Sequence, residues 1–364
     1  MTKIRDIIQA IEEKAPLSLQ ESYDNAGMQV GDSNAEATSA LLCLDVTEDI
    51  LDEAIARGAN LIISHHPLIF RGLKRLVGAT PVERIVAKAI KHGIAIYSAH
   101  TNMDSAECGV SVHAAKKIGM TDIQVLSPQK GKLLKIVTFV PTAQAEAVKQ
   151  AMWRAGAGNI GNYDCCSYTM SGNGTFRAMD GANPFVGEIG EHHTEAEERI
   201  EVIVPVWRKG AVLRAMIEAH PYEEPAFDII ALENASNTGL GVVGNIEPED
   251  AMHLMARIKQ IFEVGAVSYS GLKEPTVVTR VAFCGGSAIE EAGDAIAAGA
   301  QMLITGDVKY HDFTTYNDRI IIANIGHYES EHFTKEIFYD IIQKKIPNFA
   351  TYYAEKEKNP INYL

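Results

Sequence analysis

Residues 61–70 read LIISHHPLIF, and this stretch decides the fold. An apolar run of this length that stops at a turn residue is typical of a parallel strand covered on both faces. Binding sites in open α/β sheets form just beyond the carboxyl ends of such strands. His65 and His66 stand at that position, and imidazole is the commonest metal ligand. Successive strand residues point in opposite directions. The pair therefore favours two ions, one for each imidazole, and the alternative is a His-His pair that only faces water.

The chain uses this unit twice. Residues 42–66, LCLDVTEDILDEAIARGANLIISHH, align without gaps with residues 283–307, FCGGSAIEEAGDAIAAGAQMLITGD, at a constant offset of 241. The pattern predicts a strand–helix–strand unit in each half of the chain. A duplicated fold can keep its packing residues without any function, so the repeat alone does not indicate a site.

A further apolar run follows each copy and ends in the same polar residues. AIYSAHTNMD ends with His100 and Asp104, and RIIIANIGHYESE ends with His327 and Glu331. In both, a histidine precedes a carboxylate by four residues, which places the two groups on one face of a helix that begins near the histidine. Packing does not call for polar side chains at strand ends, so the sequence predicts metal ligands there.

Bulk properties narrow the classes of function. A length of 364 residues predicts two or three domains. A net charge of −14 argues against general binding of nucleic acid or anionic membranes, which require a basic face. The five cysteines have no metal-type spacing, so we expect reduced thiols and a cytoplasmic protein. No apolar run reaches about 18 residues, and we expect no membrane span.

The pattern changes from about Leu133. A strand, a helix, a Gly/Asn-rich strand region, a strand, a helix and a last strand follow one another. This β-α-β-β-α-β order is the ferredoxin-like arrangement. Because it separates the two copies of the repeat, we interpret residues 131–235 as an inserted domain. Residues 1–130 and 236–364 then form one discontinuous domain.

Further polar groups lie close to the predicted site. Arg71 and Lys74 follow the His-His pair and could hold a phosphate by charge-assisted hydrogen bonds, although a solvated loop is the commoner use of such residues. Asp24 belongs to an Asp-Asn-x-Gly segment that favours a tight turn. Asp307 takes the place of His66 in the second copy. It could orient a ligand or serve in acid–base chemistry, and capping of a helix is the alternative.

Two other motifs have simpler interpretations. Residues 239–244, GLGVVG, match G-x-G-x-x-G but follow a loop and open no helix. We therefore expect a tight chain reversal and no dinucleotide site. His192-His193 is predicted to lie in an exposed, acidic hairpin loop, and His220-Pro221 is predicted to form a rigid turn.

Six motifs in this order resemble the Nif-three-like family, often labelled GTP cyclohydrolase I type 2 homologues: DNAGMQVG, LIISHHPLIF, SAHTNMD, GLGVVGN, ITGDVKYHD and IGHYESE. The likeness covers about residues 1–130 and 236–364, and the insert resembles the PII/CutA-like domain of the longer bacterial members. Tyr23 stands where the family usually has tryptophan. Val242 stands where arginine is common, which weakens any phosphate role for that loop.

The resemblance implies a site for two divalent cations whose ligands are His65, His66, Asp104, His327 and Glu331. It leaves His100 beside the ligands, as a candidate with Asp307 for proton transfer. It also implies a ring-shaped homohexamer with the metals facing an inner cavity. A His/carboxylate set without cysteine accommodates Zn, Fe, Mn or Co.

The expected activity is hydrolytic opening of the guanine imidazole ring of GTP by metal-activated water, with Arg71 or Lys74 on the triphosphate. Two alternatives remain. One is a metal-binding regulator or scaffold without turnover, whose insert senses a small molecule. The other is a metal-dependent phosphoesterase acting on nucleotides.

Overall fold

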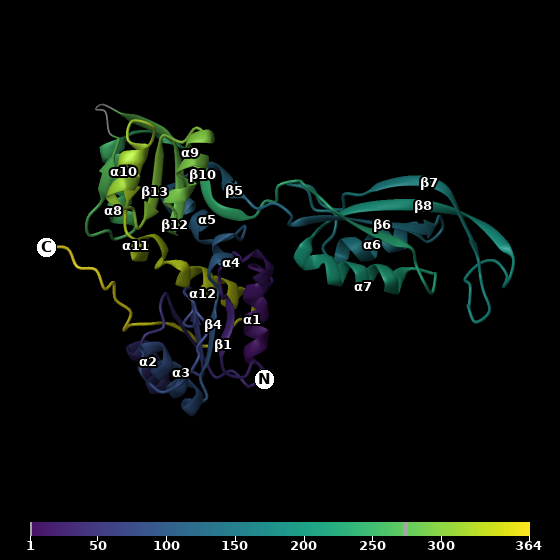
Figure 1. Ribbon diagram of the computed structural model, residues 1–364, viewed down its shortest axis with the longest axis horizontal. Coiled ribbons are helices and arrows are strands. Elements are labelled where there is room, and N and C mark those ends of the chain that lie inside the picture. The colour runs from purple at the N-terminus through teal and green to yellow at the C-terminus, as the bar shows by residue number, and fades with distance from the viewer. Residues whose placement is uncertain (1, 272–275) are drawn as a thin grey trace. The chain divides into compact units, whose positions relative to one another are not determined.

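The chain folds into two units, and each is described by itself. Met1–Pro128 and Thr238–Leu364 form a discontinuous unit, and Gln129–Asn237 form a continuous one. The structure is a computed structural model that describes residues 2–271 and 276–364 (Figure 1). It is a mixed α/β fold with three sheets.

The first sheet of the discontinuous unit carries the decisive stretch. Its five strands lie in the order β1 (Gly27–Val30), β4 (Ala95–Ser98), β3 (Leu61–Ser64), β2 (Ala40–Cys43) and β15 (Thr351–Tyr353). β2, β3, β4 and β15 run parallel, and β1 is antiparallel to β4. Every residue of β2, β3 and β4 is buried, as expected for apolar strands covered on both faces.

Two helices connect these parallel strands. α2 (Glu48–Arg57) and α3 (Pro81–His92) begin at Thr47 and Thr80, whose hydroxyls accept backbone N–H groups of the first turn. Both end at a glycine in the left-handed region, Gly58 and Gly93. Their apolar faces pack on the sheet through Ile50, Ala54, Ile85 and Ala89. This packing fixes where each strand ends, and therefore where the histidines lie.

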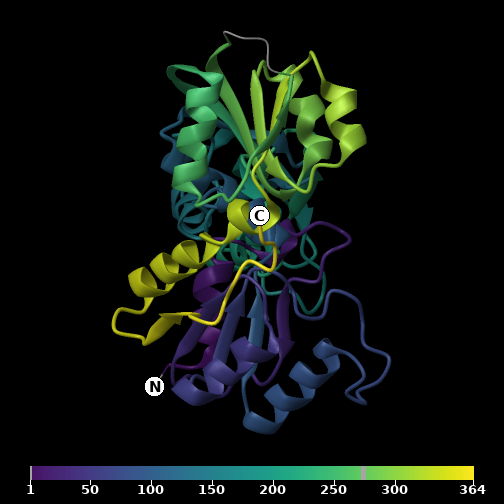
Figure 2. The same ribbon diagram turned by 90° about the vertical axis from the view of Figure 1, so that its left-hand side faces the viewer.

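The second sheet of the same unit repeats this core. Its strands lie in the order β11 (Ser268–Ser270), β14 (Ile321–Asn324), β13 (Met302–Gly306), β12 (Val277–Ser287), β10 (Gly239–Asp250) and β5 (Thr121–Pro128). β12, β13 and β14 run parallel, and β11 is antiparallel to β14 as β1 is to β4. α9 (Ala292–Ala297) and α10 (Tyr310–Tyr316) connect the parallel strands. Figure 2 shows the two sheets within this unit.

The remaining helices of this unit complete its core. They are α1 (Ile4–Glu12), α4 (Thr101–Asp104), α5 (Val110–Ile118), α8 (Ala251–Ile261), α11 (His327–Glu331) and α12 (Thr334–Lys345). α1 packs on α12, α5 contacts β10 and β12, and α11 contacts β12 and β13. The short helices α4 and α11 directly follow β4 and β14, and carry the predicted His-x-x-x-acid pairs at or next to their ends.

The expected reversal at GLGVVG is wrong. These residues begin strand β10, which pairs with both β5 and β12. Gly241 has φ +65°, and a Cβ there would lie 3.1 Å from both Cys284 Cβ and Leu126 Cδ2. The glycine is required by close strand packing and not by a turn.

The continuous unit is a four-stranded antiparallel sheet with two helices. The strand order is β7 (Tyr168–Arg177), β8 (His192–Pro205), β6 (Leu133–Pro141) and β9 (Phe227–Ala231). α6 (Ala145–Arg154) and α7 (Lys209–Ala219) cover one face, with Ile136, Ile200 and Val202 in the core. His192 and His193 lie in strand β8 opposite Arg177 and Phe176, so their placement in a loop is wrong. The strand was not predicted because its first residues are mostly polar, as is usual for a hairpin at the edge of a sheet.

None of the helices within residues 2–271 and 276–364 has the length and hydrophobicity that a membrane crossing requires.

Candidate metal centre

Ligand-type side chains from both halves of the discontinuous unit converge. His65 and His66 follow β3, His100 and Asp104 flank and end α4, and His327 and Glu331 begin and end α11. Three groups have ligand atoms within 4.8 Å of one another: His65, His66 and His100; His66, His327 and Glu331; His65, Asp104 and Glu331. These clusters could hold metal ions.

His65 is the most informative member. Its side chain is fully buried, and Nδ1 donates a hydrogen bond to the Ala99 carbonyl at 2.9 Å. The proton on Nδ1 leaves Nε2 with a free lone pair. Nε2 lies 3.6 Å from Asp104 Oδ1 and 3.8 Å from Glu331 Oε1, and it is buried without a hydrogen-bond partner among the described residues. A buried nitrogen of this kind between two carboxylates fits a cation ligand.

His66 and His327 form the other half of the cluster. Nδ1 of His66 donates to Asp45 Oδ1 at 2.9 Å, and Nδ1 of His327 donates to Asp307 Oδ2 at 2.7 Å. Both Nε2 atoms lie 3.0 Å from Glu331 Oε2, and they are 3.2 Å from each other. Because the carboxylates hold the Nδ1 protons, the two lone pairs meet in one place. Only a proton or a metal cation relieves that repulsion.

Glu331 links the two groups through its two carboxylate oxygens. Oε1 faces His65, and Oε2 faces His66 and His327. Its side chain is only 5% exposed. Gly286 makes room for it, since a Cβ at that position, where φ is +66°, would lie 2.3 Å from Glu331 Oε1. The carboxylate therefore joins the group that contains His65 to the group that contains His66 and His327.

The electrostatics of the cluster also favour positive charge. Burial opposes the imidazolium form of His66, but hydrogen bonds from its ring to Asp45 and Glu331 outweigh burial and raise its pKa to about 10. For His327, burial is likewise outweighed by Glu331 and Asp307, which raise the pKa to about 9. Burial raises the pKa of Asp104, whereas the three histidines hold the pKa of Glu331 well below its usual range despite burial. Protons on the histidines thus balance the negative charge of the carboxylates, and divalent cations would balance the same charge.

His100 lies beside the candidate ligands and is held by Asp24, whose sequence context predicts only a turn. Its Nδ1 bonds Asp24 Oδ1 at 2.8 Å, and Asp24 Oδ2 accepts the backbone N–H of Thr101 at 3.0 Å. Burial raises the pKa of Asp24, but bonds from His100 and Thr101 outweigh it and lower the pKa to about 2. The His100 ring lies 5.3 Å from His65 and 5.5 Å from His66, centroid to centroid.

The other candidates occupy different places. Asp307 accepts from His327, and α10 begins after Lys309, so the alternative of a helix cap at Asp307 is wrong. Arg71 and Lys74 are exposed in the segment between β3 and α3. That segment approaches the cluster at Phe70, whose ring lies 6.4 Å from the His100 ring.

Asp45 is the residue that sequence reasoning missed altogether. It follows β2, and β2 pairs in parallel with β3, so the carboxyl ends of both strands meet at one edge. The same rule that singled out His65 and His66 therefore points to Asp45. At the offset of 241 its counterpart is Gly286, which holds no ligand but admits Glu331.

A cavity of about 350 Å³ adjoins the cluster. His327 and Asp307 line it, and Ser268, Asn324 and Tyr363 supply further polar groups. A small molecule bound there would contact the imidazole of His327 directly.

The fold and the cluster define a duplicated α/β protein in which histidines and carboxylates at the carboxyl ends of strands could hold metal ions. The family model described as Duf34/NIF3 (NGG1p interacting factor 3) matches residues 2–360, and the chain belongs to this family.

Curated relatives and solved structures agree with this assignment. A protein of Halalkalibacterium halodurans named GTP cyclohydrolase 1 type 2 homolog is 41% identical over 88% of this chain and 87% of its own. A Bacillus subtilis protein of the same name is 34% identical over 99% and 98%. The crystal structure of a Bacillus cereus protein related to NIF3 superposes with a TM-score of 0.87 at 34% identity, covering 100% of this chain and 99% of that one.

Proposed function

We propose that this protein is a hydrolase that uses two divalent cations, one held by His65, Asp104 and Glu331, the other by His66, His327 and Glu331. The observation that carries the proposal is the buried Nε2 of His65, which faces two carboxylates and has no other partner among the described residues. Zn, Fe, Mn and Co all accept this donor set.

The chemistry of the site follows from its donors. When bound, a cation pair supplies Lewis acidity and lowers the pKa of water to near neutrality. Asp45 and Asp307 fix the tautomers of His66 and His327, so each Nε2 is directed at the cluster. His100, fixed by Asp24, and the half-exposed Asp307 are the groups that can pass protons between the cluster and solvent.

The proposed substrate is a purine nucleotide, GTP first among them. The relatives' name and the 350 Å³ cavity beside His327 support this choice. Water would add to C8 of guanine and break one C8–N bond of the imidazole ring, with the proton passing to the released nitrogen. A second water would break the remaining C8–N bond and release formate. Arg71 and Lys74 are the proposed triphosphate contacts.

The test begins with full-length protein purified with its metals retained. Elemental analysis gives the metal per chain, and incubation with GTP and a nucleotide panel is followed by formate release, pterin fluorescence and phosphate release. The expected result is about two metal ions per chain and formate from GTP. His65→Ala should abolish formate release, whereas His311→Ala, a change at an exposed histidine, should not.

Each outcome separates the candidates. Phosphate release without formate would contradict the cyclohydrolase activity and support a phosphoesterase activity. Metal without turnover of any nucleotide would leave a metal-binding regulator or scaffold. A triphosphate role for Arg71 and Lys74 requires that Arg71→Ala and Lys74→Ala raise KM for GTP before they lower kcat. An unchanged KM in both would discard it.

For the insert we propose the ferredoxin-like, PII/CutA-like arrangement. The element order β6-α6-β7-β8-α7-β9 and the strand order β7-β8-β6-β9 support it. We also propose that six chains form a ring. Native mass spectrometry should then give six times the 39.6 kDa of one chain, and a monomer or dimer at micromolar concentration would contradict it.

A further inference from the structure

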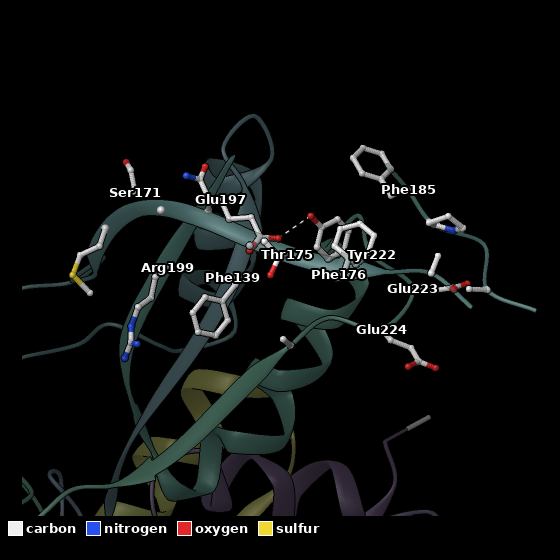
Figure 3. Close-up of a pocket in the computed structure, with 18 residues that line it drawn as sticks. Phe139, Ser171, Thr175, Phe176, Phe185, Glu197, Arg199, Tyr222, Glu223 and Glu224 are labelled. Atoms are coloured by element: carbon white, nitrogen blue, oxygen red, sulfur yellow. Dashed lines mark hydrogen bonds between the residues drawn. The ribbon is translucent and has the colours of Figure 1, made fainter. Parts of the chain in front are cut away.

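The continuous unit Gln129–Asn237 contains a cavity of about 700 Å³ that the metal chemistry does not use (Figure 3). Phe139, Glu197 and Arg199 line it. They alternate along β6 and β8 with Ile136, Val140 and Ile200, which pack against the helices. Because neighbouring strand residues point to opposite faces, the cavity lies on the face of the sheet opposite α6 and α7.

Aromatic rings form much of the wall. Phe139, Phe176, Phe185 and Tyr222 all line the cavity. The Tyr222 ring lies 6.0 Å from Phe176 and 6.4 Å from Phe185, centroid to centroid, so Tyr222 contacts two of the other rings (Figure 3). A cavity of this volume with such walls has the size and character of a small-molecule site.

A buried carboxylate lies among these rings. Glu197 is 8% exposed, and its Oε1 accepts the Tyr222 hydroxyl at 2.8 Å (Figure 3). Its Oε2 lies over Gly174, where a Cβ would be 2.1 Å away. Among the residues that the structure describes, no hydrogen bond ends on Oε2. The oxygen can therefore accept a hydrogen bond from a ligand in the cavity. Because the carboxylate is buried, such a bond would be stronger than one made in water.

The charges around the cavity favour a cation. Glu223 and Glu224 join Glu197 in the wall, and Arg199 is the one basic lining residue among the described residues. Arg199 is already bound, since its Nε and Nη2 each lie 2.9 Å from Glu201 Oε1, and its guanidinium stacks 5.8 Å from the Phe139 ring centre. Burial and the charge of Glu197 raise the pKa of Tyr222, so the phenol stays a donor to the carboxylate.

From these contacts we infer that the insert binds a small organic cation, with an ammonium or amidinium head on Glu197 and a flat or alkyl body between the aromatic rings. The carboxylate supplies a charge-assisted hydrogen bond, and the rings supply cation–π attraction and apolar contact. The site lies in a different unit from the metal cluster, and it does not depend on the proposed hydrolase activity.

The test uses three probes of the same shape and different charge: benzamidine, benzamide and benzoate. Binding to the full-length protein is measured by saturation-transfer NMR and calorimetry at millimolar probe. Benzamidine should bind at least about tenfold more tightly than benzamide, because a buried charged pair exceeds a neutral hydrogen bond by this order. Benzoate should not bind. Because the readout is binding, loss of catalytic metals leaves the test intact.

Two variants locate the site. Glu197→Gln should weaken benzamidine about tenfold or more. Its matched control is Glu195→Gln, since Glu195 lies two residues away on the same strand and pairs with His193 outside the lining. Gly172→Leu should block the cavity: Gly172 lines it, and a Cβ there meets no atom within 4 Å, so the substitution fills space without backbone strain.

The results decide the inference in either direction. Equal affinity for benzamidine and benzamide, or binding of none of the probes, would overturn it. Benzamidine binding that survives both Glu197→Gln and Gly172→Leu would place the cation elsewhere and overturn it as well. Loss of binding in both variants, with circular dichroism melts like that of the parent and of Glu195→Gln, would establish the site.

Discussion

His66 and His327 bring their Nε2 atoms within 3.2 Å of each other across 261 residues of chain. His66 ends the first copy of the repeat, and His327 lies in the segment that follows the second copy. Each ring donates its Nδ1 proton to a carboxylate, Asp45 or Asp307. Imidazoles held in this way direct lone pairs at a common point. The two groups of ligand-type side chains thus draw on both halves of the chain, and Glu331 belongs to both groups.

Removal of the shared carboxylate should affect both cation positions. Glu331→Gln keeps the shape but loses the charge between the two groups, so metal content should fall from about two ions per chain to well below one. Asp104→Asn touches only the group with His65, and should leave one ion. Elemental analysis after dialysis measures both. Glu336→Gln on α12, which pairs with His113 and Lys117, is the control. Equal metal loss in Glu331→Gln and Asp104→Asn would contradict a bridging role.

Asp307 and Asp45 should tune metal affinity without contacting the metal. Asp307→Asn and Asp45→Asn keep an oxygen that accepts from the imidazole Nδ1 but remove the charge that makes the ring a stronger donor. Metal affinity should fall about 10- to 100-fold. Competition with a chromogenic chelator measures it. Asp312→Asn in the first turn of α10 removes the same charge nearby and should change affinity little. Unaltered metal affinity in both test variants would show that these aspartates do not tune the histidines as metal ligands.

Much of this cluster could be predicted from the sequence because its signals are local. An apolar strand that ends in His65-His66 and a repeated His-x-x-x-acid spacing each occupy a few consecutive residues. Asp45 and Asp24 were missed because their roles depend on partners 21 and 76 residues away. Neither lies at a spacing that marks a ligand. Their partners become visible only when strand order and the path of the loop before β1 are known.

The misread glycines have the same explanation. GLGVVG carries the local pattern of a turn, yet Gly241 serves a close approach to Cys284 and Leu126, which lie on strands β12 and β5. Tertiary packing overrides the local preference here. Gly286 is a similar case, since its role is set by a carboxylate 45 positions along the chain.

Gly286 provides a sharp test of the space around Glu331. Gly286→Ala should displace the Glu331 carboxylate, because the added Cβ would lie 2.3 Å from Oε1. Gly299→Ala is a matched control: Gly299 also has positive φ, at +76°, but a Cβ added there would meet no atom of the described residues within 4 Å. Both should lose about 1–2 kcal/mol of stability from left-handed strain. Only Gly286→Ala should also lose metal, as measured by thermal melts and elemental analysis. Full metal content in Gly286→Ala would contradict the argument.

The insert should lose stability in acid through His220. Its Nε2 donates to the Phe139 carbonyl at 2.9 Å, and its Nδ1 accepts the Tyr222 N–H at 3.1 Å, so the neutral ring holds the turn that carries Tyr222. Burial lowers the pKa of His220, against the opposing effect of Phe139 and Glu197. As pH falls, His220 therefore binds a proton more readily in the unfolded chain than in the folded chain. Stability should fall as pH drops below about 6.5, with a slope of up to about 1.4 kcal/mol per pH unit.

Denaturant unfolding between pH 7 and pH 5, followed by tryptophan fluorescence, measures this effect. Trp153 and Trp207, the two tryptophans of the chain, both lie in Gln129–Asn237, so the signal reports on the insert. His220→Gln keeps an amide N–H for the Phe139 carbonyl and cannot titrate, so it should lower stability at pH 7 but flatten the slope. His192→Gln, at an exposed histidine of the same unit, should keep the slope of the parent. A parental slope in His220→Gln would assign the acid sensitivity to another group.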